Sequence, residues 1–150
     1  MELEKEIDQS RFRNEAHKLG VNLLFTYGWF YNYVATMLKK YGITTQQFNV
    51  LRILRGHRPH PASIKFIRER MLDKMSDASR IVEKLRTKGL VERKTCPADR
   101  RSCEVVITPK GMQLLSRIDK EDPEMDKVFS RLSQPEIKQL NQLLDKMRGK

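Results

Sequence analysis

Cysteine is scarce in this sequence, with two residues in 150. A small secreted fold held together by disulfides needs a far higher cysteine density, so we expect free thiols in a reducing compartment. The first ten residues, MELEKEIDQS, are acidic and polar. A secretory signal needs the opposite, a basic region followed by an apolar one. These features together predict a cytoplasmic protein.

Sequence signatures of catalysis are also missing. There is no Gly-rich phosphate loop, no pair of carboxylates in a cleft-like context, and no Ser/His/Asp set with a nucleophile elbow. His57 and His60, with His17 as a third ligand, invite a metal interpretation, but no cluster of cysteines or acids accompanies them. We therefore expect no enzyme activity, no cofactor and no metal.

Long hydrophobic runs are limited to one segment, residues 21–38, which contains no charged residue. Its 18 residues just reach the lower limit for crossing a bilayer, and Asn22, Gly28 and Asn32 dilute its hydropathy. The segment therefore predicts a helix buried against protein, and we expect no membrane partner.

Positive charge is abundant, with 30 Lys and Arg against 19 Asp and Glu and a formal net charge of +11. Residues 51–111 contain sixteen of these cations and seven of the acids, so most of the excess lies in the middle of the chain. Such a concentration favours a polyanionic partner such as nucleic acid.

Helical patterns occupy the first half of the chain. Residues 8–40 predict one long helix that is apolar nearly all round at its centre, which suggests cover from a partner chain. Thr44 and Gln47 fit a capping box at the start of a second helix, and a short helix follows at residues 64–72. Asp73 is the expected cap of a basic helix that ends before Gly89.

The pattern then changes to that of a β-hairpin. Residues 90–95 and 103–108 alternate like short strands and are joined by CPADRRS. Thr108 is expected to cap a helix that reaches about Glu121, where Asp122 caps a continuation, and Ser133 is expected to cap the last helix. The predicted fold is mainly α with a small β-hairpin (α+β), and the element order is that of a winged helix-turn-helix.

In such a fold the basic helix and the hairpin, or wing, are the candidate DNA contacts. The side chains expected to face DNA from the basic helix are Lys74, Ser76, Ser79, Arg80 and Lys84. The alternative for these residues is an ordinary solvated face. Asp77 would be repelled by phosphates, so we expect it to cap or pair.

At the tip of the hairpin, Arg100 and Arg101 are candidates for the minor groove, whose negative potential attracts arginine. A surface ion pair is the compatible alternative. If the hairpin is symmetric, Cys96 and Cys103 lie opposite each other at nearly disulfide distance, as a candidate redox pair. Two incidental free thiols are the simpler interpretation.

An aromatic stripe runs along the first helix, where Phe25, Trp29 and Tyr33 recur at steps of four. Such a stripe is typical of a core or a dimer interface. It is also a candidate ligand-binding site for a small aromatic or apolar effector, with the tyrosine hydroxyl as its polar group.

The stretch KMSDASRIVEKLRTKGLVERKTCPADRRSCEVVITPKG resembles the region from the recognition helix through the wing of MarR-type transcriptional regulators. The shared motifs are the G-L-V-x-R strand start, the D-R-R wing tip and the L/I-T-x-x-G helix restart, and the resemblance covers about residues 40–115. It implies an obligate homodimer with a small-molecule pocket between its dimerisation and DNA-binding parts. It also implies that Asp99 orients an arginine, Arg101, for insertion.

On this basis we expect a single winged helix-turn-helix domain, 1–150, with dimerisation helices at 8–40 and 112–148 and a DNA-binding lobe at 44–107. The expected function is that of a sequence-specific regulator that binds double-stranded DNA as a homodimer on a pseudo-palindromic operator, a repressor modulated by a small ligand. The alternative is a winged-helix protein-interaction module that does not bind DNA.

Overall fold

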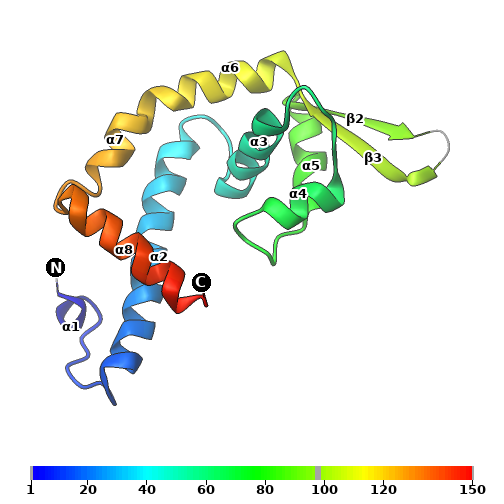
Figure 1. Ribbon diagram of the computed structural model, residues 1–150. Coiled ribbons are helices and arrows are strands. Elements are labelled where there is room, and N and C mark those ends of the chain that lie inside the picture. The colour runs from blue at the N-terminus through cyan, green and yellow to red at the C-terminus, as the bar shows by residue number, and fades with distance from the viewer. Residues whose placement is uncertain (1, 97–98, 150) are drawn as a thin grey trace. The chain divides into compact units, whose positions relative to one another are not determined.

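The computed structural model describes residues 2–96 and 99–149, with the side chains of residues 95–103 outside the description. The chain divides into two compact units, Met1–Met112 and Gln113–Lys150. The fold is mainly helical with a small antiparallel sheet, as predicted (Figure 1). Its elements are α1 (Leu3–Glu6), α2 (Glu15–Lys39), α3 (Thr45–His57), β1 (Ala62–Ser63), α4 (Ile64–Arg70), α5 (Ala78–Thr87), β2 (Val91–Cys96), β3 (Asp99–Ile107), α6 (Pro109–Ile118), η1 (Asp119–Glu121), α7 (Asp122–Lys127) and α8 (Gln134–Met147).

The long first helix starts later than the sequence suggested. The predicted start at residue 8 is wrong, because Asp8 has a positive φ of 51° and α2 begins only at Glu15. Asn14 caps α2 by accepting a hydrogen bond from the His17 backbone N–H at 2.8 Å. The preceding segment forms the short α1, which is tied to α2 by an ion pair between Glu4 and Lys18.

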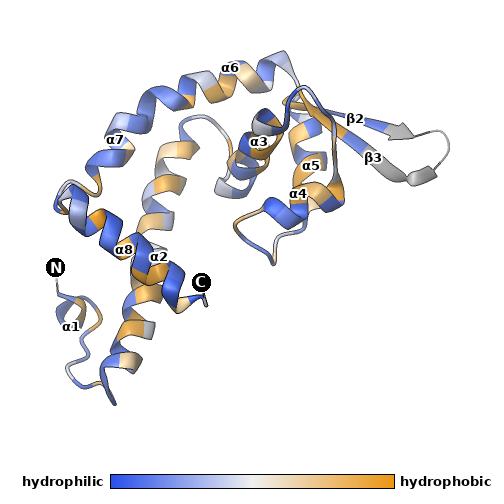
Figure 2. Cartoon of the chain, in the orientation of Figure 1, coloured by the Kyte–Doolittle hydropathy of each residue, from blue (hydrophilic) through white to orange (hydrophobic). Residues whose placement is uncertain are grey.

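Helix α2 leaves many apolar side chains in contact with solvent, and hydrophobic residues follow much of its length (Figure 2). Leu24 is 75% exposed and Tyr27 is 63% exposed, and Leu19, Trp29 and Tyr33 are also exposed. No helix among the described residues combines the length and the hydropathy that a membrane crossing requires. The exposed apolar surface of α2 therefore lacks cover within the described chain.

Helix α3 lies at the centre of the first unit and packs against α2, α4, α5 and β3. The predicted capping box is confirmed, because Thr44 Oγ1 accepts from the Gln47 N–H at 3.2 Å and Gln47 Oε1 accepts from the Thr44 N–H at 3.1 Å. Val50 and Leu51 are fully buried on the inner side of this helix. The capping box therefore fixes the start of the helix around which the unit is built.

The sheet has the order β1-β3-β2 and is antiparallel throughout. Strands β2 and β3 form the predicted hairpin, with Val91 opposite Ile107. Strand β1 was not predicted, because a two-residue strand is too short to show alternation. Its Ala62 pairs with Val105 and is buried, which attaches the start of α4 to the sheet.

The connection from α5 through the hairpin to α6 is held by hydrogen bonds around Gly89. Gly89 has a φ of +70°, as expected for the residue after a helix C-cap. Thr108 Oγ1 donates to the Gly89 carbonyl at 2.8 Å and accepts from the Gly111 N–H at 3.1 Å, so the predicted N-cap role of Thr108 is confirmed. The first turn of α6 is thereby fixed against the end of α5.

The second unit contains the end of α6 and the helices that follow it. The predicted helix to Glu121 ends at Ile118, and the three residues Asp119–Glu121 form the tighter turn η1. The predicted cap by Asp122 is wrong, since Asp122 is the first residue of α7 and Glu121 precedes it without a side-chain cap. The capping box at Ser133 and Glu136 is confirmed. On α8, Leu140, Leu143 and Met147 are exposed.

Candidate nucleic-acid interface

Helix α5 is amphipathic, with one buried apolar side and one polar side. Ala78, Val82 and Leu85 are buried, and most of the remaining side chains of the helix are polar and exposed. The expected cap by Asp73 is wrong. Asp77 is the N-cap, and its Oδ1 accepts from the Arg80 N–H at 3.0 Å. The expectation that Asp77 caps or pairs is confirmed.

Asp73 organises the turn before α5 instead of capping the helix. Its Oδ1 accepts from the Met75 N–H at 2.9 Å, and its Oδ2 accepts from the Ser76 hydroxyl at 2.8 Å. This local bonding of an aspartate to the backbone two residues later competes with helix formation. Residues 74–76 therefore form a turn, and α5 starts four residues later than Asp73 would have allowed.

The five residues expected on the basic helix are consequently divided between two elements. Ser79, Arg80 and Lys84 lie on α5 and are exposed. Lys74 and Ser76 lie in the turn that precedes it, where Lys74 Nζ donates to the Glu69 carbonyl at 2.6 Å. The structure thus gathers these residues around the N-terminal half of α5.

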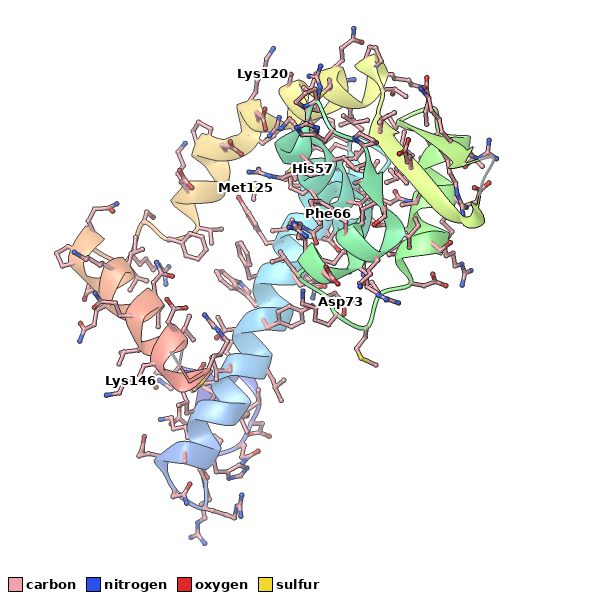
Figure 3. All side chains as sticks on the ribbon, turned by 45° about the vertical axis from the view of Figure 1, so that its right-hand side comes forward. His57, Phe66, Asp73, Lys120, Met125 and Lys146 are labelled. Atoms are coloured by element: carbon pink, nitrogen blue, oxygen red, sulfur yellow. The ribbon has the colours of Figure 1, made fainter. Side chains whose placement is uncertain are left out.

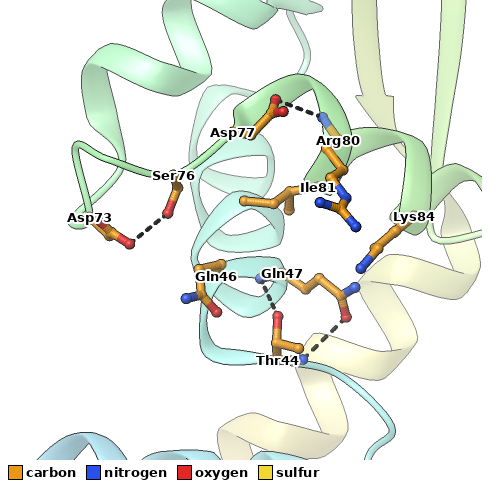
Figure 4. A pocket seen from close by; sticks show the side chains of 9 residues that line it. All are labelled: Thr44, Gln46, Gln47, Asp73, Ser76, Asp77, Arg80, Ile81 and Lys84. Atoms are coloured by element: carbon orange, nitrogen blue, oxygen red, sulfur yellow. Dashed lines mark hydrogen bonds between the residues drawn. The ribbon is translucent and has the colours of Figure 1, made fainter. Parts of the chain in front are cut away.

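A groove of about 410 Å³ separates α5 from the start of α3 (Figure 4). Ser76, Asp77, Arg80, Ile81 and Lys84 line one side of the groove. The other side is formed by Thr44, Gln46 and Gln47, and Asp73 also lines it. The α3 residues were not predicted to belong to a site. The capping box was the available signal, because it marks the start of a helix, where the macrodipole is positive.

Two cations line the groove, Arg80 and Lys84. Among the residues with described side chains, neither the Arg80 guanidinium nor the Lys84 ammonium forms a hydrogen bond or an ion pair. A helix N-terminus also carries partial positive charge. The Asp73 and Asp77 carboxylates also line the groove, but both are hydrogen-bonded to the turn and the helix cap. Arg80 and Lys84 are therefore the groups of the groove that can bind an anion such as a phosphate.

Glu83, the acidic residue of α5, is already paired with two arginines. Glu83 accepts from Arg86 Nη2 at 2.7 Å, and its Oε2 lies 3.9 Å from Arg93 Nη1 on β2. The hydrogen bond from Arg86 holds the pKa of the Glu83 carboxyl below its ordinary value, with Arg93 adding to the effect. Arg86 is thus paired, whereas Arg80 and Lys84 remain available to a ligand.

Lys88 connects the end of α5 to the turn after α2. Its Nζ donates to the Gly42 carbonyl at 2.5 Å and to Gln47 Oε1 at 3.2 Å. Gln47 is 4% exposed and belongs to the capping box of α3. A lysine counted among the basic charges of the sequence therefore acts as a structural crosslink within the first unit.

The wing has a register that differs from the symmetric hairpin we expected. Cys103 pairs with Thr95, and Cys96 pairs with Asp99 across an irregularity between Thr95 and Cys96. The expectation that Cys96 and Cys103 lie directly opposite each other is therefore wrong for the backbone. Because the side chains of residues 95–103 lie outside the description, a redox role of the pair stays a prediction.

The wing tip is formed by the start of β3. Asp99, Arg100 and Arg101 lie in β3, but their side chains are among those not described. Their predicted contacts with DNA stay predictions.

The aromatic stripe and the histidines lie outside the α3–α5 groove. Phe25 is half-buried, and Trp29 and Tyr33 are 42% and 37% exposed along α2, away from the α3–α5 groove. The His57 ring centroid lies 4.0 Å from that of Phe66, as the two labelled side chains in Figure 3 illustrate. Among the described side chains, no three His, Cys, Asp or Glu residues come together as a metal site.

A model of the MarR family matches residues 41–102, which extend from the turn before α3 into the wing. The HTH-type transcriptional regulator MhqR of Bacillus subtilis (strain 168) is 31% identical over 113 residues, or 73% of this chain and 75% of MhqR. The chain belongs to the MarR family. The HTH-type transcriptional repressor IacR of Pseudomonas putida is 29% identical over 110 residues, or 73% of this chain and 65% of IacR.

Solved MarR-type structures share the fold. A cysteine-to-serine variant of MarR from E. coli, complexed with operator DNA, superposes with a TM-score of 0.80 at 23% identity, covering 92% of this chain and 99% of that one. BpsR of Bordetella bronchiseptica, whose DNA binding is regulated by 6-hydroxynicotinic acid, gives a TM-score of 0.78 at 23% identity, with 87% and 98% covered. The prediction of a winged-helix transcription regulator of the MarR family is confirmed.

Proposed function

We propose that this MarR-family chain represses transcription by binding a pseudo-palindromic operator as a homodimer, with α5 in the major groove. The observation that carries the proposal is the α3–α5 groove, in which Arg80 and Lys84 are both exposed and have no partner among the described side chains. A groove of this kind fits the phosphate backbone, and the neighbouring N-terminal end of α5 then reaches base edges.

The side chains that we assign to DNA are Lys74, Ser76, Ser79, Arg80 and Lys84 around α5, with Asp99, Arg100 and Arg101 at the wing. The short hydroxyl side chains permit close approach to the backbone, and Arg80 is long enough to contact guanine or phosphate. At the wing, arginine suits a narrow minor groove. In this assignment Asp99 orients Arg101 for insertion.

Homodimer formation is supported by the apolar side chains that α2 and α8 leave exposed. Leu24 and Tyr27 on α2 and Leu143 on α8 are each more than half exposed. A second copy of the chain would bury such surfaces. Two α5 helices related by a two-fold axis would enter major grooves about 34 Å apart, which requires a palindromic site.

A small aromatic or apolar effector is proposed to control DNA binding. BpsR is regulated by 6-hydroxynicotinic acid, and an organohalide-sensing regulator with a TM-score of 0.81 was crystallised with 2,4-dichlorophenol. In this chain we assign Phe25, Trp29 and Tyr33 to such a site. An effector changes affinity only by preferring one arrangement of the DNA-binding parts over another.

The proposed role as a DNA-binding regulator also determines the expected compartment and activity. We place the protein in the cytoplasm and assign it no enzyme activity, because its relatives are named as transcriptional regulators. A winged-helix module that binds only proteins would use the same basic surface for an acidic partner. Family membership favours the DNA-binding role over this alternative.

Selection of bound sites from random double-stranded DNA tests the proposed function. We expect one pseudo-palindromic consensus, bound with an affinity that falls steeply with salt, by a slope of roughly 0.9 for each phosphate neutralised. The affinity is measured at several salt concentrations. Analytical ultracentrifugation measures whether the protein has the mass of a dimer. No enriched sequence together with a flat salt response would contradict the proposal and favour the protein-interaction module.

Asp77→Ser is expected to tighten DNA binding about threefold at low salt, because a unit charge about 6 Å from a phosphate contributes about 0.7 kcal/mol in water. Serine is as good an N-cap as aspartate, so the stability of α5 should be retained. Asp77→Ala is the control, since it removes the same charge but also the cap, at about 1 kcal/mol of stability. Unchanged affinity of Asp77→Ser at low salt would place α5 away from the DNA.

A further inference from the structure

The turn between α4 and α5 exposes two large apolar side chains. Met75 is 93% exposed and Leu72 is 86% exposed, the highest values among the large apolar side chains of the described residues. Neither position is needed for the core, which takes Met71 and Ala78 from the two ends of the same segment. The turn therefore carries apolar surface that the fold does not use.

This turn is ordered despite its exposure. The Met75 N–H donates to Asp73 Oδ1 at 2.9 Å, and the Ser76 N–H donates to the Asp73 carbonyl at 3.3 Å. At the start of the turn, the Leu72 N–H donates to Asn49 Oδ1 on α3 at 2.9 Å. The backbone around Met75 is thus fixed by these hydrogen bonds. A contact made by the Met75 side chain would therefore cost little conformational entropy of the backbone.

The surroundings of Met75 favour a polyanion as its partner. Lys74 precedes it, and Arg80 lies one turn into the helix that follows. The two nearby acids, Asp73 and Asp77, are both hydrogen-bonded within the turn and at the helix cap. Met75 thus lies between two cations that can bind phosphate, Lys74 and Arg80, while the neighbouring carboxylates are directed to the turn and the cap. This arrangement fits a ligand with negative charge at its edges and an apolar group at its centre.

Double-stranded DNA has this distribution of groups in its major groove. Phosphates line the groove, and the 5-methyl group of thymine is the apolar group on its floor. Met75 lies two residues before the N-cap of α5, and the N-terminal residues of a recognition helix are those that meet base edges. The unbranched thioether side chain of methionine adapts readily to such a contact.

Resting on the DNA-binding function proposed above, we infer that Met75 is a specificity-determining residue that selects thymine through its 5-methyl group. The contact adds apolar readout to the charged contacts of Arg80 and Lys84. It predicts a thymine in each half-site at the position that faces the start of α5.

Replacement of single thymines by deoxyuridine in the selected operator tests this inference, because it removes the methyl group and leaves base pairing intact. With the wild-type protein we expect one position in each half-site where the replacement weakens binding about threefold to fivefold, the effect of one buried methyl group. Met75→Ala should bind the thymine operator more weakly by a similar factor and should no longer distinguish thymine from deoxyuridine at that position. Met75→Leu should retain part of the discrimination.

Leu72→Ala is the matched control, since Leu72 is an exposed apolar residue of the same turn and should leave the discrimination unchanged. Circular dichroism and thermal unfolding of all variants confirm that the fold is retained. An operator without thymine, thymines that are all replaceable without loss, or undiminished discrimination by Met75→Ala would each overturn the inference while DNA binding stands. Failure of the wild-type protein to bind any DNA would overturn the proposed function together with it.

Discussion

Arg80→Ala is expected to weaken binding to the selected operator by roughly tenfold to a hundredfold, because a bidentate arginine contact to a base contributes about 1–3 kcal/mol of discrimination. The fold should be unaffected. Arg80 is exposed, its guanidinium has no partner among the described side chains, and alanine keeps the backbone N–H that Asp77 caps. Titration of labelled operator at several salt concentrations measures the loss. It also shows whether Arg80 binds phosphate, in which case the salt slope falls by about 0.9.

Arg86→Ala is the matched control on the same helix. Its guanidinium is already bonded to Glu83, and its side chain is 49% exposed. We expect a change of less than about threefold, the effect of one charge at a distance from the DNA. Equal losses for Arg80→Ala and Arg86→Ala would show that net charge alone determines binding and would contradict the role assigned to Arg80.

Gly111→Ala is expected to lower the free energy of unfolding by about 3 kcal/mol, the upper end of the usual cost of overpacking. A Cβ at this position would lie 2.4 Å from the Leu90 carbonyl oxygen and 2.7 Å from Ile107 Cγ1. The carbonyl cannot move freely, since it accepts the Thr108 N–H at 3.1 Å. Thermal unfolding at fixed protein concentration should show a midpoint about 6–12 °C lower.

Gly56→Ala provides the opposite control. Gly56 lies inside α3, and a Cβ there would meet nothing within 4 Å. Alanine should therefore raise stability by about 0.5–1 kcal/mol, because glycine is a poorer helix residue. A Gly111→Ala protein that unfolds at the wild-type temperature would contradict the close packing of α6 against the end of α5.

Local signals in the sequence predicted most of the fold. The capping box at Thr44, the helix end at Gly89 and the hairpin each depend on residues within a few positions, and all three are confirmed. The start of α5 was misplaced because Asp73 and Asp77 are both plausible caps, and the choice depends on hydrogen bonds to Met75 and Ser76. Competition between two similar local structures is poorly resolved by sequence pattern.

The candidate site was predictable in its residue types but not in its arrangement. Arg80 and Lys84 were identified from charge and position, whereas their groove partners Thr44 and Gln46 come from a helix more than thirty residues earlier. Contacts over such a separation leave no local periodicity. The short strand β1 was missed for the same reason, since Ala62 becomes a strand residue only by pairing with Val105.

The hydrogen bonds of Lys88 have a mechanical consequence. One ammonium group at the C-terminal end of α5 bonds both to the Gly42 carbonyl, just after α2, and to the side chain of Gln47 at the start of α3. A shift of the Gly42 carbonyl must either break its hydrogen bond with Lys88 Nζ or move the end of α5 as well. Motion at the end of α2, the helix that bears the aromatic stripe, is therefore transmitted through one side chain, Lys88, to α5, the helix that we propose to read DNA.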